Sequence, residues 1–285
     1  MISEGMHSLV DTINEALLLL GLARSRRKPD RDHPLGFGRE LYFWSFIVSL
    51  LVMALGAGLS LYQGVLHLRH PQPMQEVGLN YLVLALSFLC ELLSGWPGFV
   101  AFRAGKGSQG YFSAFRASKD PSLFIVVFDG YAALIGLLIA ALGIVASQAF
   151  GRPEFDGAAS IGVGAVLAVS SMLLARETKA LLIGEAALPE VRSSILNIAQ
   201  SDPDVDHANG VMTVQLGPNQ IFAALSAEFR DGLDTGQIER CVSRMEAAVK
   251  HAHMDVTILF VKPQTRGEWD RRIGLAQGPH ATPAR

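Results

Sequence analysis

The sequence predicts an α-helical membrane domain with about five visible spans, followed by a small α+β domain. Composition is the first reason, because 50% of the 285 residues are hydrophobic and only 18% are charged, a departure from soluble domains in the membrane direction. The second reason is the distribution of charge, which is concentrated in a few loops and in the C-terminal third. We expect a membrane domain at residues 1–180, a second domain at 181–263 and a polar, mobile tail at 264–285.

Apolar runs of the length needed to cross a bilayer recur along the first two thirds of the chain. The first run begins almost at Met1, but it has neither a basic n-region nor a cleavage site, so it does not read as a signal peptide. Glycine and alanine are frequent in the last run, where they suit close helix packing. The predicted spans are residues 6–22, 41–68, 79–102, 121–150 and 157–174.

Loop charge predicts the orientation of these spans. Arginine and lysine gather in residues 23–40 and 102–120 and directly after the last span, and the positive-inside rule places these segments in the cytoplasm. The loops at 67–78 and 150–156 are poorer in both residues and are expected on the outer side. This alternation would put Met1 outside, at the start of a span. It suggests a six-span protein cut near the start of its second span.

After the last apolar run, the chain changes from long apolar segments to shorter segments in which apolar and polar residues alternate or recur with helical spacing. Residues 189–200 have helical periodicity, and residues 211–216 and 221–229 alternate around a Gly-Pro-Asn turn, which predicts a hairpin. A second helical stripe at 234–250 starts at Asp234 or Thr235 as the N-cap, and a β-rich run follows at 255–261. The order αββαβ predicts a ferredoxin-like cytoplasmic domain. A domain of about 75–80 residues has a small core and gains from dimerisation.

His7 and Asp11 are the strongest candidate site residues. A spacing of four stacks their side chains on one face of a helix, inside an apolar segment where ionisable groups are expensive. An imidazole and a carboxylate together suit a divalent transition metal, above all zinc. The alternative is a structural role, in which the two side chains bond to each other or to the backbone.

Three further polar residues lie within the predicted spans. Asp129 is the acid in the middle of its span, and it is either a ligand or an interhelical hydrogen-bond partner. Glu91 is a candidate proton relay, or else it reaches toward a loop. Asn14 shares the face of Asp11, and we favour a hydrogen bond between helices over ligation for it.

Other function classes find little support. The net charge of −2 argues against nucleic-acid binding. Two cysteines, Cys90 and Cys241, suggest neither a disulfide framework nor a thiolate metal site. The chain has no nucleophile motif, phosphate loop or dinucleotide fingerprint, so we predict neither an enzyme nor a bound cofactor.

Several segments together resemble the cation diffusion facilitator family over about residues 1–262. HPLGFGRELYFWSF at 33–46 is the most specific of them, whereas His-x-x-x-Asp alone would be weak. The others are SEGMHSLVDTIN at 3–14, SKDPSLFIVVFDGYAALIG at 118–136, FDGAASI at 155–161 and LIGE at 182–185.

The resemblance implies a homodimeric six-span antiporter that exports a divalent metal, usually zinc, in exchange for protons. His7 and Asp11 match the family's second-span metal pair, and Asp129 would be the third ligand. Asp129-Gly130 stands where a subgroup has Glu-Asp, so one of two carboxylates is missing. The family's cytoplasmic ligands do not match, since Ser226 stands where a histidine would, and we predict no metal site of that pattern in the tail domain.

The missing carboxylate in the fifth span and the absence of the family's metal ligands from the tail domain keep a second hypothesis open. A membrane protein could retain this fold as an interaction or regulatory module without transporting anything. In both cases we expect a multi-pass membrane protein, and the compact loops favour a bacterial inner membrane.

Overall fold

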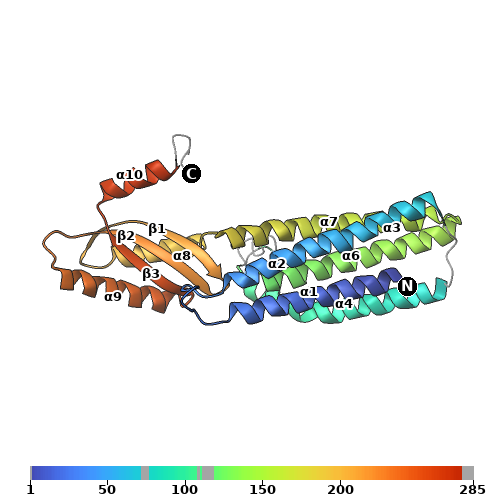
Figure 1. Ribbon diagram of the computed structural model, residues 1–285, viewed down its shortest axis with the longest axis horizontal. Helices are drawn as coiled ribbons and strands as arrows, with labels where there is room; N and C mark the ends of the chain where they lie inside the picture. The colour runs from blue at the N-terminus through green and yellow to red at the C-terminus, as the bar shows by residue number, and fades with distance from the viewer. Residues whose placement is uncertain (1, 72–76, 108–109, 111–118, 278–285) are drawn as a thin grey trace. The chain divides into compact units, whose positions relative to one another are not determined.

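The structure is a computed structural model (Figure 1). It describes the backbone of residues 2–71, 77–107, 110 and 119–277, and their side chains except those of 2–9, 11, 77, 106, 122–123 and 273–277. The chain divides into two compact units, Met1–Ile183 and Gly184–Arg285.

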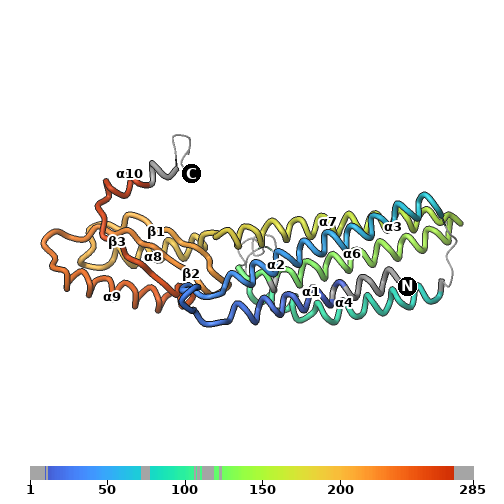
Figure 2. The backbone as a smooth tube through the Cα atoms, in the orientation of Figure 1, coloured from blue at the N-terminus to red at the C-terminus, as the bar shows by residue number. Residues whose placement is uncertain are grey.

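The first unit consists of long helices that run side by side (Figure 2). A short π-helix, η1, joins α2 to α3 without a break, so the three form one rod over Arg39–Arg69. Helix α7 packs against α2, α3 and α6. The elements are α1 (Ile2–Ser25), α2 (Arg39–Leu51), η1 (Val52–Ala57), α3 (Gly58–Arg69), α4 (Val77–Lys106), α6 (Pro121–Phe150) and α7 (Glu154–Ile183).

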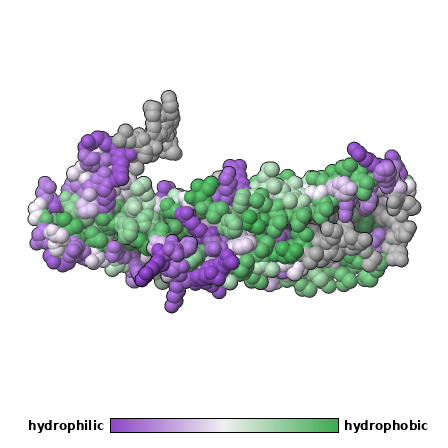
Figure 3. Space-filling view, in the orientation of Figure 1, coloured by the Kyte–Doolittle hydropathy of each residue, from purple (hydrophilic) through white to green (hydrophobic). Residues whose placement is uncertain are grey.

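Four helical segments among the described residues are long and apolar enough to cross a membrane: Arg39–Arg69, Gly78–Gly105, Phe124–Phe150 and Glu154–Ile183. They coincide with four of the predicted spans and confirm the helical membrane domain. The remaining predicted span, 6–22, lies within α1, where many side chains fall outside the description. Apolar side chains cover much of the visible surface of this unit (Figure 3), as expected for helices that face lipid.

Glycines let α3 and α7 approach closely. A Cβ atom at Gly64 would lie 2.8 Å from the carbonyl oxygen of Gly157, and one at Gly157 would lie 3.0 Å from the carbonyl oxygen of Gly64. At Gly164 the same atom would come within 2.9 Å of the backbone nitrogen of Leu61. Backbone contact of this kind is how small residues stabilise helix pairs in membranes. The packing role expected for the glycines of the last span is therefore confirmed.

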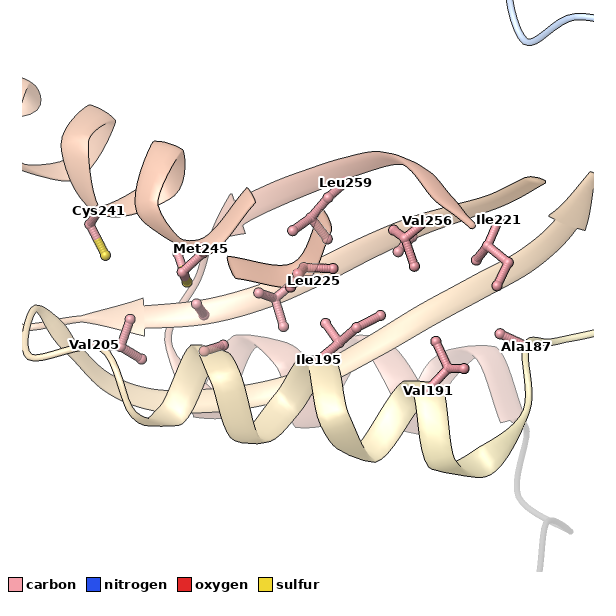
Figure 4. Close-up of a cluster of buried hydrophobic side chains, with 14 residues drawn as sticks. Ala187, Val191, Ile195, Val205, Ile221, Leu225, Cys241, Met245, Val256 and Leu259 are labelled. Atoms are coloured by element: carbon pink, nitrogen blue, oxygen red, sulfur yellow. The ribbon is translucent and has the colours of Figure 1, made fainter. Parts of the chain in front are cut away.

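The second unit has the predicted αββαβ order, followed by one more helix. Strand β2 pairs antiparallel with β1 and parallel with β3, which gives the sheet order β1-β2-β3. Helices α8 and α9 pack on one face of the sheet, with Ile195, Leu225 and Met245 in the core between them (Figure 4). The elements are α8 (Pro189–Gln200), β1 (Val205–Gly217), β2 (Gln220–Phe229), α9 (Thr235–Ala252), β3 (Val256–Pro263) and α10 (Arg266–Gln277).

Local chemistry explains how this domain is built. Asp234 is the N-cap of α9, where its side chain accepts a hydrogen bond from the backbone N–H of Gln237 while the Gln237 side chain accepts one from Asp234 N–H. Helix α10 was not predicted from the polar composition of 264–285. Its Trp269 indole occupies the space that a Cβ atom at Gly210 of β1 would need, so this contact links α10 to the sheet.

The other face of the sheet is apolar. Met212 and Phe260 are 57% and 63% exposed, and the rings of Phe222 and Phe260 meet edge to face at 5.5 Å. On β1 two of the buried side chains, Thr213 and Gln215, are polar. The Thr213 hydroxyl accepts a hydrogen bond from the backbone N–H of Ala187, and the Gln215 amide donates one to the carbonyl oxygen of Gly217.

Candidate functional site

Two of the predicted site residues, Glu91 of α4 and Asp129 of α6, line one small cavity inside the helical unit. Both side chains are half-buried. The cavity measures about 20 Å³, enough for a single water-sized occupant. Its other walls are apolar or small and come from α6 itself and from three further elements, α1, η1 and α7. The residues are Val10, Val52, Gly56, Ala133 and Leu167.

The π-helix η1 forms one wall of this cavity. Val52 and Gly56, four residues apart at the start and near the end of η1, both line it. A π-turn widens the helix locally and is frequently found at functional sites. Gly56 has no side chain, so it takes up little space in the wall of the cavity that Glu91 and Asp129 also line. The sequence does not predict this feature, because a π-turn has no sequence signature as clear as that of an α-helix.

Helix α1 reaches the cavity through Val10, which is 8% exposed. His7 and Asp11 lie on the same helix, one turn apart along its backbone, but their side chains fall outside the described residues. The structure therefore brings Asp129 and Glu91 together beside Val10. The ligand roles of His7 and Asp11 stay predictions.

Asn14 lies one helical turn beyond Val10 and is 3% exposed. Neither its amide oxygen nor its amide nitrogen hydrogen-bonds to any described residue. A buried amide without a partner costs about 1–3 kcal/mol, so such a group calls for an explanation. A ligand or an ordered water within reach of the amide would satisfy it. The hydrogen bond between helices that we favoured for Asn14 stays a prediction.

A larger cavity of about 440 Å³ shares Val10, Gly56 and Glu91 with the small one. A third cavity of about 160 Å³, lined by Trp96 and Tyr131, also includes Glu91. Glu91 thus stands where the three cavities meet. Part of the lining of the larger cavity is polar and comes from residues that were not among the predicted site residues, although polar side chains within apolar spans are a visible signal. These residues are Ser60, Gln63, Ser87 and Ser160.

In the second unit, Asp202, Asp204 and Cys241 place three possible donor atoms within 4.8 Å of one another. Arg244 already fills the position that a cation would take, since its guanidinium donates to Asp202 at 2.8 Å and to Asp204 at 2.7 Å. This bond to Arg244 lowers the pKa of the Asp202 carboxyl. Burial raises the pKa of the Cys241 thiol to about 12, so the thiolate needed for ligation is disfavoured. The cluster is an ion pair that fastens the start of β1 to α9.

Comparison with known proteins gives a consistent result. The model of the cation efflux transmembrane domain matches residues 1–183. Relatives include the "Proton-coupled zinc antiporter SLC30A9, mitochondrial" of Homo sapiens, 34% identical over 232 residues, which are 80% of this chain and 41% of the relative. "Metal tolerance protein C4" of Arabidopsis thaliana is 32% identical over 80% of this chain and 50% of its own length. "Cation-efflux pump FieF" of Citrobacter koseri is 25% identical over 85% and 75%.

This chain spans 41% of the length of the antiporter relatives that it matches. The domain match covers the helical unit in full, and the relatives' names agree with it. The chain belongs to the cation diffusion facilitator family.

Proposed function

We propose that this protein exports a divalent metal cation, most readily zinc, across a membrane in exchange for protons. Family membership and the names of the zinc antiporter relatives support this activity. One structural observation carries it: two carboxylates from different helices, Glu91 and Asp129, line a cavity of ion size inside an apolar bundle. Acids within membrane-spanning helices are expensive and mark ion or proton pathways.

His7, Asp11 and Asp129 are the proposed ligands. Zinc takes about four nitrogen or oxygen ligands at roughly 2.0–2.2 Å, so three protein ligands leave one position for water or for a neighbouring group. Glu91 lines the same cavity and is one such neighbour. The buried Asn14 amide lies one helical turn from Val10, which lines the cavity, and its oxygen is a hydrogen-bond acceptor.

Proton coupling follows from the ligand chemistry. Zinc binds neutral imidazole and ionised carboxylates, so each bound proton competes with the metal for the same atoms. Protons that enter from the more acidic side release the metal, and metal from the other side releases the protons. Glu91, which faces both the ion-sized cavity and the larger one, is positioned to pass protons between them. Rocking of helices around a fixed site would alternate its access.

The proposal also includes a homodimer and a membrane location. The apolar open face of the sheet, with Met212, Phe222 and Phe260, is a surface that a second copy could cover. We keep the bacterial inner membrane as the proposed location because of the compact loops. FieF is a bacterial relative, whereas the names of the antiporter relatives specify mitochondria.

Zinc flux into proteoliposomes under an imposed pH gradient tests the proposal. Asp129→Asn keeps the shape of the side chain but loses the charge, and we expect it to lower zinc affinity on the order of 100-fold and to abolish flux. Gly130→Ala is the matched control on the same helix, since a Cβ atom there meets nothing within 4 Å. pH-driven flux that is normal in Asp129→Asn would refute the site.

Glu91→Gln separates the two roles proposed for Glu91. If Glu91 is a ligand, the variant loses zinc affinity. If it relays protons, the variant keeps its zinc affinity while flux loses its dependence on the pH gradient. Zinc binding by the native chain with no flux under any gradient would favour the alternative, a non-transporting interaction or regulatory module.

A further inference from the structure

We propose that His67 and Asp156 form a second cation-binding station, on the side where the metal is released. The inference rests on the proposed function, because it gives the transported cation a further stop on its way out. The two residues come from different helices, near the end of α3 and in the first turn of α7. Nδ1 of His67 lies 3.2 Å from Oδ2 of Asp156.

The chemistry of the pair suits zinc. An imidazole nitrogen and a carboxylate oxygen are both common zinc ligands, and the carboxyl group has a second oxygen to offer. The side chains are 48% and 31% exposed, so water can reach the pair and complete a coordination shell. A station with two protein ligands binds weakly, which is the property required where a transported ion must leave.

Helix geometry places the pair in line with the large cavity. Gln63 and Ser160 line that cavity. His67 follows Gln63 by four residues on α3, and Asp156 precedes Ser160 by four residues on α7. Residues four apart share a helix face, one turn of about 5.4 Å apart. The pair therefore continues two cavity-lining faces by one turn, on the side away from the cytoplasm according to the loop charges.

The backbone around the pair is held firmly. Gly64 and Gly157, which neighbour the pair in sequence, bring α3 and α7 into backbone contact. The Ser160 hydroxyl also donates a hydrogen bond to the Asp156 carbonyl oxygen at 3.0 Å. Because both helices are fixed here, the imidazole and the carboxylate meet without any movement of the backbone. Nearby charges include Arg152 and Glu154, which lie 3.7 Å apart and offset each other.

Zinc titration of the full chain in lipid nanodiscs tests this station. The background is Asp129→Asn, in which the proposed transport site is disabled. We expect this variant to retain one weak class of bound zinc. Adding His67→Ala should weaken the remaining binding on the order of tenfold or more. Adding Asp156→Asn, which keeps the shape of the side chain and a hydrogen-bond acceptor, should weaken it as well. His70→Ala is the control, because His70 is exposed and only three residues away.

The result that overturns the station is unchanged weak binding when His67→Ala or Asp156→Asn is added to the Asp129→Asn background. Failure of the proposed function gives a different pattern, in which the single variant Asp129→Asn binds as much zinc as the native chain. The two readouts are independent, since the station is measured by the variants at positions 67 and 156 and the transport site by the variant at position 129.

Discussion

Replacing Gly64 by alanine should separate α3 from α7 and destabilise the helical unit. The new Cβ atom would lie 2.8 Å from both the Gly157 carbonyl oxygen and the Ile161 backbone nitrogen. An ordinary contact begins at about 3.4 Å. Both obstacles are backbone atoms, so no side chain can rotate away and the helices themselves must move. Overpacking of this kind typically costs about 1–3 kcal/mol.

Gly58→Ala is the matched control on the same helix. Its Cβ atom would meet Met53 O at 3.9 Å, which is an ordinary contact. Alanine is the better helix former by roughly 0.5–1 kcal/mol, so this variant should be as stable as the native chain or slightly more so. The two substitutions are chemically identical, and their effects should differ in sign.

Thermal unfolding of the full chain, followed by the loss of its monodisperse elution peak, measures the difference. We expect Gly64→Ala to unfold several degrees below the native chain and Gly58→Ala to unfold at or above it. If the two variants unfold at the same temperature, the close backbone contact at Gly64 does not limit the packing of α3 on α7. The destabilised variant should also lose zinc flux, because α7 contributes Leu167 to the ion-sized cavity.

Two predictions concern the second unit. Arg244→Ala removes the guanidinium that lowers the pKa of Asp202, so the backbone amide hydrogens at the start of β1 and in α9 should exchange faster in the variant than in the native full chain. Because the pKa of Asp202 is lower in the folded state, this stabilisation is present at neutral pH and is lost as the pH falls through the folded pKa. Equal rates of amide hydrogen exchange in the variant and the native chain at neutral pH would contradict the prediction. Phe260→Ser should shift the native chain from dimer to monomer in light scattering, while Met254→Ser, at another exposed position, should not. A monomeric native chain would remove the dimer from the proposal.

Much of the fold could be predicted from the periodicity of apolar residues along the sequence. Apolar runs predicted four of the helices that can cross a membrane, and alternating and helical stripes predicted the αββαβ order of the second unit. Both signals are local, because the period of apolar residues reflects only which side of its own helix or strand each residue occupies. Helix α10 was not predicted by these patterns, because Trp269 of α10 packs against Gly210 of β1, more than fifty residues earlier in the chain.

It was harder to predict which face of a strand is buried than to predict where the strand lies in the sequence. On β1, alternation alone did not show that Thr213 and Gln215 would be buried while Met212 stays exposed. The reason is that hydrogen bonds decide the matter. Thr213 meets a backbone N–H from the segment before α8, and the Gln215 amide finds a nearby carbonyl oxygen. Such partners are known only once the chain is folded.

The sequence by itself determined the class of protein: lengths of apolar helix, the chemistry of His7, Asp11 and Asp129 as candidate ligands, and the family. The tertiary structure decided which polar groups meet. It placed Glu91 beside Asp129, put Val52 and Gly56 of a π-turn into the same wall, and paired His67 with Asp156 across two helices. The physical reason is that a helix face is a local property of spacing, whereas the meeting of two faces depends on how closely backbones pack, here through Gly64 and Gly157.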